Sequence, residues 1–368
     1  MIILKHLDNE KLLISTSKSL LLYDISKDTS SDIELPQLSV IQKGNHETNI
    51  ISSIATSKCG NYFALLRNKQ VIIYDKKLNV IKEISLKRAA HSIMLFGGYN
   101  LLVADKTGDV YLYKSENEGG DKDGILLFGH LSMLLDVVLS DNEKFLITCD
   151  RDEKIRVSHY PNTYNIEKFC LGHKEFVTKL VLLENSFLLS ASGDGQIILW
   201  DYLKGVNLHK IDTSDYVKDK SVLNNFIETM KHNKTDVMCL PIVDIQVQKI
   251  ENVYYIVVQI YKLKSLLIFS IDAFDNFESR FIDELSFKSE IQTFSLRTHL
   301  FVATKEDIKT FCVLDNKYVE VKKVFFENFK ISIEGDDNCD IITLFKRKFD
   351  NVEEYLERKR QRIETKCN

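Results

Sequence analysis

Short apolar runs separated by polar turns follow one another along most of this 368-residue chain. The runs are rich in branched and aromatic side chains, and Gly, Asn, Asp or Lys bounds them, which is typical of β-strands joined by tight turns. Three pairs of such runs stand in the first third of the chain, at 11–15 with 20–24, 62–66 with 71–75, and 100–104 with 110–113. The pattern predicts a protein built mainly of antiparallel strands.

A longer unit repeats near the middle of the chain. Gly-His pairs at 129–130 and 172–173 stand 43 residues apart, and Asp152 and Asp194 follow them at a spacing of 42. The second segment closes on Trp-Asp at 200–201. This period and these pairs are typical of the WD repeat, in which four strands make one blade. Blades bury their faces by stacking in a ring, so we expect an all-β fold, a seven-bladed WD-repeat β-propeller.

The remaining blades are weaker copies of the same unit. Upstream, Tyr23, Tyr74 and Tyr113 stand where the middle repeat has Trp200. Downstream, the Gly-His and Trp-Asp pairs are missing, but further strand pairs occur at 254–259 with 266–269 and at 300–303 with 308–312. We assign residues 1–345 to the propeller and 346–368 to a basic helical tail. We expect residues 1–4 to close the ring by pairing with a strand from the other terminus.

Two stretches interrupt the repeat. The first is a polar loop at 116–124. The second, at about 213–235, is too long for a hairpin and carries apolar residues at helical spacing, so it predicts a short amphipathic helix between blades five and six. The apolar face of this helix covers either a blade edge or a partner protein, and the first alternative is the commoner one.

Composition narrows the class of protein. The formal net charge is −4, which does not fit a free-standing nucleic-acid binder, because phosphate neutralisation needs clustered Lys and Arg. The seven cysteines are scattered without C-x-x-C spacing, and charged residues stand in the first ten positions, where a secretory leader would be apolar. We therefore expect free thiols in a reducing compartment, and no apolar run is long enough to span a membrane.

The Gly-His and Trp-Asp pairs predict a structural network. In blades of this type the opening His bonds the turn Asp and a strand Ser or Thr, with the Trp at the end of the chain of bonds. His173, Asp194, Trp200 and Ser190, or alternatively Ser192, supply the four members in blade five. Blade four has an incomplete set, which we assign as follows: His130, Thr148 and Asp152, with Ser158 at the Trp position.

We find no motif for chemistry. Phosphate loops, nucleophile elbows and H-E-x-x-H zinc motifs are all missing from the sequence. His130 and His173 could be metal ligands or bases, but the structural network explains them better. We expect no catalytic residue, no metal and no bound cofactor. A propeller enzyme would need clustered acids or His around the central channel, and the sequence indicates none.

One anomaly points to a partner protein. Lys154, Arg156 and Ser158 share one face of a strand, and Arg156 stands where blade five has the apolar Ile198. A charge in this covered position needs a partner. Either Asp150 or Asp152 pairs with Arg156 as an internal clamp, or Arg156 meets acidic groups of another protein.

The same residues carry a family resemblance. The segments 130–136, 150–158 (Asp-Arg-Asp-Glu-Lys-Ile-Arg-Val-Ser) and 170–177 closely resemble the WD-repeat non-catalytic subunits of tRNA (guanine-N(7)-)-methyltransferase. Parts of the tail at 349–359 are similar too. The resemblance is specific over about 129–205 and in the tail; elsewhere it is only that of a generic propeller.

The resemblance implies a function. Members of this family bind a separate catalytic subunit, which uses S-adenosylmethionine to methylate guanosine in the variable loop of certain tRNAs. The propeller stabilises the active form of that subunit and supplies no catalytic residue. The family's partner-binding basic residue corresponds to Arg156, with Lys154, Arg151 and Asp152 as neighbours. We expect tRNA to bind mainly through the partner. The alternative is a general WD-repeat scaffold, such as a ubiquitin-ligase substrate receptor.

The tail carries a basic cluster. Phe345 to Lys366 predicts a helix, and Arg358, Lys359, Arg360 and Arg362 gather within it. Such a run is typical of a nuclear localisation signal or of a contact to the tRNA backbone. We accordingly expect the nucleus as the location, with the cytoplasm as an additional one.

Overall fold

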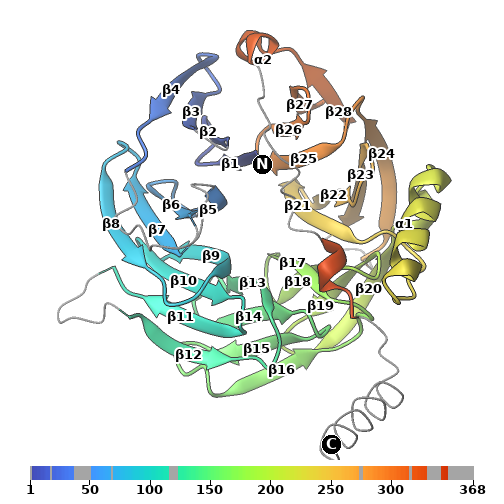
Figure 1. The fold of residues 1–368 in the computed structure, drawn as a ribbon, viewed down its shortest axis with the longest axis horizontal. Helices are drawn as coiled ribbons and strands as arrows, with labels where there is room; N and C mark the ends of the chain where they lie inside the picture. Colours follow the sequence, from blue (N-terminus) through green and yellow to red (C-terminus); the bar gives the residue numbers. More distant parts are fainter. Residues whose placement is uncertain are drawn as a thin grey trace, which may run out of the picture.

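Seven four-stranded antiparallel sheets arranged around a central axis make up the described part of the chain (Figure 1). The computed structural model describes residues 2–16, 19–36, 51–67, 69–115, 123–272, 277–314, 317–329 and 341–346. Each sheet consists of four consecutive strands, with the first strand lining the centre of the ring and the fourth at its rim. The predicted seven-bladed β-propeller is confirmed.

Among the described residues, no helix separates the strands of the first four blades. Blades one to four comprise β1 Ile3–His6, β2 Lys11–Ser15, β3 Leu20–Asp24, β4 Thr29–Ile33, β5 Ile51–Thr56, β6 Tyr62–Arg67, β7 Gln70–Asp75, β8 Val80–Ser85, β9 Ala90–Phe96, β10 Asn100–Asp105, β11 Asp109–Tyr113, β12 Ile125–Gly129, β13 Leu134–Leu139, β14 Phe145–Asp150, β15 Ile155–His159 and β16 Ile166–Cys170.

The predicted insert follows blade five and separates it from blades six and seven. They comprise β17 Val177–Leu182, β18 Phe187–Ser192, β19 Gln196–Asp201, β20 Val206–Asp212, β21 Ile242–Ile250, β22 Val253–Ile260, β23 Ser265–Asp272, β24 Ser279–Ser286, β25 Ile291–Leu296, β26 Leu300–Thr304, β27 Ile308–Leu314 and β28 Lys317–Val321.

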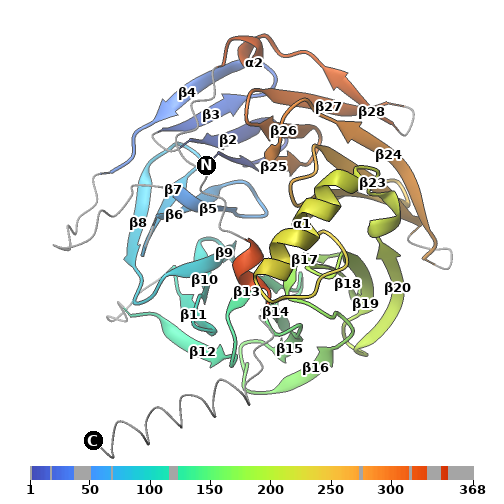
Figure 2. The same cartoon turned by 45° about the vertical axis from the view of Figure 1, so that its right-hand side comes forward.

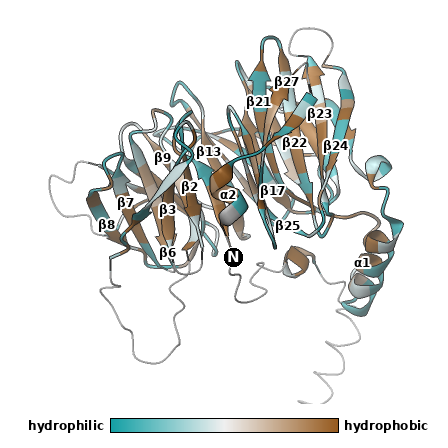
Figure 3. Cartoon of the chain, turned by 90° about the horizontal axis from the view of Figure 1, so that it is seen from above, coloured by the Kyte–Doolittle hydropathy of each residue, from teal (hydrophilic) through white to brown (hydrophobic). Residues whose placement is uncertain are grey.

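The middle strands of each blade are the most deeply buried. In blade five, β18 and β19 are buried along almost their whole length, whereas β20 alternates between exposed and partly buried positions. The hairpin between β18 and β19 turns at Asp194-Gly195, and Gly195 takes a φ of 73° that a side chain would disfavour. Viewed from the side, the apolar residues lie on the strands between neighbouring blades (Figure 3). The core is therefore distributed between blades rather than gathered in one place.

The ring closes differently from the sequence prediction. Within the described residues, β1 pairs only with β2, and no strand from the C-terminal part joins the first blade. Side chains make the closure instead: the Ser295 hydroxyl of blade seven lies 2.7 Å from His6 Nδ1 and accepts from its backbone N–H at 3.0 Å. Farther out, Phe326 packs on Tyr23 and Phe301. The expected shared sheet is wrong, because each terminal blade already holds four strands of its own.

The insert after blade five contains a 3₁₀ turn, η1 Ser214–Tyr216, and a helix, α1 Lys220–His232. The Asp219 carboxylate accepts from the backbone N–H groups of Ser221 and Val222, which begins the helix. Phe226 and Met230 are buried. The apolar face of α1 therefore packs on the propeller itself, and Figure 2 shows the helix lying across one face of the ring.

The last described residues, 341–346, pack beside the insert. After the short helix α2 Val324–Asn328, a second 3₁₀ turn, η2 Ile341–Leu344, lies beside α1 (Figures 1 and 2). Phe345 is buried against Phe176 and Phe226, with ring centroids 4.8 Å and 5.9 Å away. The predicted tail helix beyond residue 346 and most of the loop at 116–124 lie outside the described residues. None of the helices described could span a membrane.

Candidate functional site

The four residues of the blade-five network form one chain of hydrogen bonds. His173 Nδ1 lies 3.1 Å from the Asp194 carboxylate, and His173 Nε2 lies 2.7 Å from Ser190 Oγ. Trp200 Nε1 donates to the same hydroxyl at 2.8 Å. A carboxylate only accepts, so Nδ1 donates to it, and Nε2 accepts the Ser190 proton. Every polar atom in this chain is satisfied, and Ser190 rather than Ser192 is its centre.

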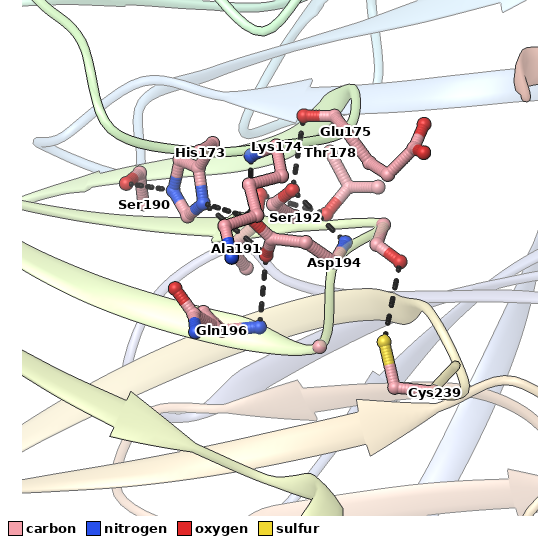
Figure 4. A network of polar contacts seen from close by, with 12 residues as sticks. His173, Lys174, Glu175, Thr178, Ser190, Ala191, Ser192, Asp194, Gln196 and Cys239 are labelled. Atoms are coloured by element: carbon pink, nitrogen blue, oxygen red, sulfur yellow. Dashed lines mark hydrogen bonds and ion pairs between the residues drawn. The ribbon is translucent and has the colours of Figure 1, made fainter. Parts of the chain in front are cut away.

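The Asp194 carboxylate also organises the turn (Figure 4). It accepts from the backbone N–H groups of Lys174 and Gln196 at 2.8 Å and 3.0 Å. Burial alone would raise the pKa of Asp194, but the hydrogen bonds that it accepts from His173 and from these two backbone N–H groups outweigh it and hold that pKa below its usual value. The network is a structural clasp with no free group for chemistry.

Blade four builds its counterpart from a different aspartate. His130 Nδ1 lies 2.9 Å from Asp150 and Nε2 lies 2.8 Å from the Thr148 hydroxyl. Asp150 also accepts from the backbone N–H groups of Asp152 and Lys154. The sequence assignment of Asp152 to this network is therefore wrong. The turns themselves are alike, since Glu153 has a φ of 68° and Gly195 at the corresponding place has 73°. The difference is that blade four has a second carboxylate, Asp150, at the strand position where blade five has Ser192, and His130 bonds to that one.

Arg156 occupies the strand position of Ile198 in blade five, and its side chain reaches Ser158, which stands at the Trp200 position. Its Nε donates to the buried Ser158 hydroxyl at 2.9 Å, and its Nη2 donates to the Thr163 carbonyl at 3.0 Å. The guanidinium lies 4.2 Å above the Phe128 ring. The expected ion pair of Arg156 with Asp150 or Asp152 is therefore wrong. Burial lowers the pKa of Arg156, and no carboxylate among the described residues pairs with it.

The Arg156 side chain is half-buried and stands beside exposed apolar surface. Its register partner on β16 is Phe169, which is exposed, and Leu126 on the neighbouring β12 is exposed too. Leu131 and Leu171, which adjoin His130 and Gly172 in the chain, are also exposed. A cation with apolar neighbours at a blade edge is the composition that protein interfaces favour, because Arg and aromatic groups are enriched there.

The other predicted partner-binding residues have different environments in the structure. Arg151 donates to the backbone carbonyls of Leu344 and Phe345, at 2.8 Å and 3.3 Å. Asp152 forms an ion pair with Lys346, with 3.4 Å between Asp152 Oδ1 and Lys346 Nζ. Both residues thus hold the chain's own C-terminal segment. Only Lys154, which is exposed, joins Arg156 in facing solvent. The cluster Arg358, Lys359, Arg360 and Arg362 lies outside the described residues.

A carboxyl near the same segment has an unusual proton affinity. Burial, followed by the negative charge of Glu153, raises the pKa of Glu175 to about 7, and the positive charge of Lys346 opposes this shift. Lys346 itself lies 2.8 Å from Glu153. The C-terminal segment therefore supplies the positive charge for a small acidic group on this face of the ring. The sequence offers no signal for it, because these residues lie far apart along the chain.

The central channel holds a second group that sequence reasoning missed. Six ionisable side chains line it: Lys5, His91, Asp136, Lys179 and Asp244 on innermost strands, and Lys58 in the turn after β5. Lys179 and Asp136 form an ion pair at 3.0 Å. The expectation that the channel lacks clustered acids and His is thus wrong. Over the described residues, however, no group of three or more His, Cys, Asp or Glu side chains is placed to hold a metal ion.

Comparison with known proteins places the fold in a functional context. The family model described as the tRNA methyltransferase TRM82 WD40 domain matches residues 113–297. The tRNA (guanine-N(7)-)-methyltransferase non-catalytic subunit wuho of Aedes aegypti is 31% identical over 352 residues, covering 91% of this chain and 80% of that protein. The non-catalytic subunit WDR4 of Homo sapiens is 43% identical over 160 residues, covering 42% of this chain and 38% of that protein.

Solved structures show the same architecture at low identity. A chain from the Mitotic Checkpoint Complex superposes with a TM-score of 0.66 at 13% identity, covering 85% of this chain and 89% of that one. The Cps50 (Swd1) β-propeller domain of Myceliophteria thermophila gives a TM-score of 0.62 at 14% identity, covering 83% and 93%. At such identities these structures support the propeller fold and nothing further.

Proposed function

Because this chain belongs to the family of tRNA (guanine-N(7)-)-methyltransferase non-catalytic subunits, we propose that it binds the catalytic subunit of that enzyme and stabilises its active form. In this role it is required for N(7)-methylguanosine formation in the tRNA variable loop. It is the non-catalytic partner, and the S-adenosylmethionine of the reaction is bound by the other subunit.

The observation that carries the proposal is the state of Arg156. Its guanidinium is half-buried over Phe128 and donates to Ser158 and Thr163, yet it has no carboxylate partner among the described residues. These contacts fix the planar group in one pose before any partner arrives. A fixed, charged fork at an apolar edge suits bidentate binding of a carboxylate on another protein. We therefore expect an acidic residue of the catalytic subunit to meet Arg156, with Lys154 beside it.

tRNA binding follows from the charge balance. With a formal net charge of −4, the chain as a whole repels a polyanion, so we expect the catalytic subunit to provide most of the affinity for tRNA. We propose a supporting contact by the basic cluster Arg358, Lys359, Arg360 and Arg362, which also serves as a nuclear localisation signal. Deleting residues 355–368 tests both roles: unchanged nuclear location and unchanged tRNA methylation would refute them.

Charge reversal at Arg156 tests the interface. We expect Arg156→Glu to weaken binding to the catalytic subunit by about 30-fold or more, because a close charge pair across an interface contributes about 2 kcal/mol or more. Affinity is measured by titrating purified propeller into the catalytic subunit. Lys317→Glu is the matched control, since Lys317 is an exposed lysine on β28, in another blade. This control should bind like the unaltered chain.

Arg156 also makes internal contacts, so the fold needs a separate check. Circular dichroism and thermal unfolding of Arg156→Glu show whether the propeller persists. Should this variant unfold, Lys154→Glu replaces it: Lys154 is exposed, and within the described residues its ammonium donates only to the Asp152 carbonyl. A folded charge-reversal variant at 154 or 156 that binds with full affinity would contradict the proposed interface and favour a general scaffold with another client.

A further inference from the structure

The central channel of the ring contains a cavity of about 650 Å³. Innermost strands of different blades contribute its charged lining: Lys5 from β1, Asp136 from β13, Lys179 from β17 and Asp244 from β21. None of these four residues belongs to the partner surface proposed at Arg156. Their hydrogen bonds and ion pairs show which of these side chains have partners and which do not.

Two of the four side chains satisfy each other. The Lys179 ammonium lies 3.0 Å from Asp136 Oδ2. The same carboxylate accepts from the Ser92 hydroxyl at 2.8 Å and from the Leu180 backbone N–H at 3.1 Å. Although burial opposes it, the negative charge of Asp136 raises the pKa of Lys179 above its usual value. Asp136 is therefore fully engaged and has little capacity left for a second cation.

The other two side chains are not satisfied. In the described structure, no hydrogen bond or ion pair within 4.0 Å engages the Lys5 ammonium, and burial and the charge of Lys179 lower its pKa. Asp244 Oδ2 accepts from Gln246 at 3.1 Å, whereas Asp244 Oδ1 is buried without any partner. Burial raises the pKa of Asp244 above its usual value. The channel thus holds an ammonium without a counter-ion and a carboxyl group with one buried oxygen that has no partner in the described structure.

A ligand that contacts both the Lys5 ammonium and the Asp244 carboxyl is best an anion with several oxygen atoms. Lys5 is partly exposed in the channel and has no counter-ion among the described residues, so an anion that reaches both Lys5 and Lys179 is attracted by two positive charges. We propose that the channel binds a phosphate group, with Lys5 and Lys179 as its cationic ligands and the Asp244 carboxyl as a hydrogen-bonding partner. The tetrahedral oxygens of phosphate reach several donors at once, which chloride does not. The cavity has room for a small group attached to the phosphate.

Thermal unfolding of the full chain tests the site. Potassium phosphate should raise the unfolding temperature above that in potassium chloride of equal ionic strength, by about 2 °C at ten times the dissociation constant. Glycerol 2-phosphate distinguishes the source: an equal rise indicates recognition of any phosphomonoester, and no rise indicates free phosphate. Absence of a rise with both compounds overturns the proposal.

Substitution of Lys5 makes the test specific. Lys5→Met removes the uncompensated charge, so in potassium chloride its unfolding temperature should equal or exceed that of the unaltered chain. The rise in unfolding temperature that potassium phosphate gives over potassium chloride should be absent in this variant. Lys58→Gln is the control: Lys58 lines the same cavity but is ion-paired with Asp141, so this variant should keep the rise. A full rise in Lys5→Met would overturn the assignment.

Phosphorus NMR provides a readout that does not depend on stability. The signal of inorganic phosphate should broaden when the unaltered chain is added, and should stay sharp with Lys5→Gln, which keeps a polar side chain in case Lys5→Met does not fold. Equal broadening by both proteins would mean that phosphate binds elsewhere on the surface, which contradicts a site in the channel.

Discussion

At the scale of single residues, neighbouring blades solve the same packing problem with different chemistry. Blade five fills the space behind its opening Gly-His with Trp200, whose N–H is bound by Ser190. Blade four fills it with Arg156 and the small Ser158. Both solutions satisfy every donor they bury, but only the second leaves a cation near the surface. A departure from the repeat therefore marks the surface that we assign to the partner.

The central hydroxyl of the blade-five clasp should be important for stability. Ser190→Ala leaves Trp200 Nε1 and His173 Nε2 buried without partners, so we expect the free energy of unfolding to fall by about 2–3 kcal/mol. Urea unfolding followed by Trp200 fluorescence measures it. Ser221→Ala, on exposed surface at the start of α1, should cost less than about 1 kcal/mol. Equal losses in the two variants would contradict the network.

The raised proton affinity of Glu175 predicts a pH dependence. Its pKa is about 7 in the folded protein, against an ordinary value of 4.5, so the folded state binds more protons between these values. The stability from this group is fully present below pH 4.5 and is lost as pH rises through 7.

The neutral variant Glu175→Gln isolates this effect. Its unfolding free energy relative to the unaltered chain should increase from pH 5 to pH 8, by on the order of 1 kcal/mol, because solvent screens a half-buried carboxyl. Urea unfolding across this range measures the difference. Lys346→Met removes the positive charge that lowers the pKa of Glu175. The midpoint of the pH-dependent change in unfolding free energy should therefore move to higher pH. A difference that does not change with pH would refute the assignment.

At the scale of elements, α1 and the C-terminal segment 341–346 form one cap over blades five and six. Phe226 of α1 and Phe345 of the segment contact each other, and both belong to the large cluster that includes Trp200. Arg151 binds the carbonyls at the end of η2, which completes the attachment. Two elements far apart in sequence thus depend on each other for burial.

Truncating the shared aromatic residue should loosen both elements. We expect Phe345→Ala to cost up to about 3–5 kcal/mol of local stability, the range for a buried Phe. Amide hydrogen exchange should speed up in 341–346 and in α1, while the blade strands stay protected. Leu314→Ala, at an exposed position on β27, should leave exchange unchanged. Unaltered exchange in α1 after Phe345→Ala would show that the two elements are independent.

The elements themselves were predictable because local patterning decides them. Buried strands such as β6 and β19 read as continuous apolar runs, and α1 reads as apolar residues at helical spacing. The contacts of Arg156 were not predictable from sequence, because they depend on a carbonyl at Thr163 and on the ring of Phe128 from another blade. Alternation along a strand gives the face of a side chain but not its partner.

At the scale of the whole molecule, the ring is held by side chains rather than by a shared sheet. The His6–Ser295 contact and the packing of α2 on blade one have no counterpart in local sequence, which is why the closure was mispredicted. The channel was missed for the same reason: Lys5, Asp136, Lys179 and Asp244 are separate along the chain, and only the radial arrangement of blades brings them together. Periodicity predicts the number of blades, and tertiary contacts decide what they enclose.

The most direct test of the central claim is to measure methyl transfer to tRNA with and without this chain. The chain is co-expressed and purified with the tRNA guanine-N(7) methyltransferase catalytic subunit of the same organism. Our account predicts a stable complex of the two proteins and clearly higher N(7)-methylguanosine formation than by the catalytic subunit alone. Failure to form a complex, together with equal activity in the presence and absence of this chain, would contradict the account.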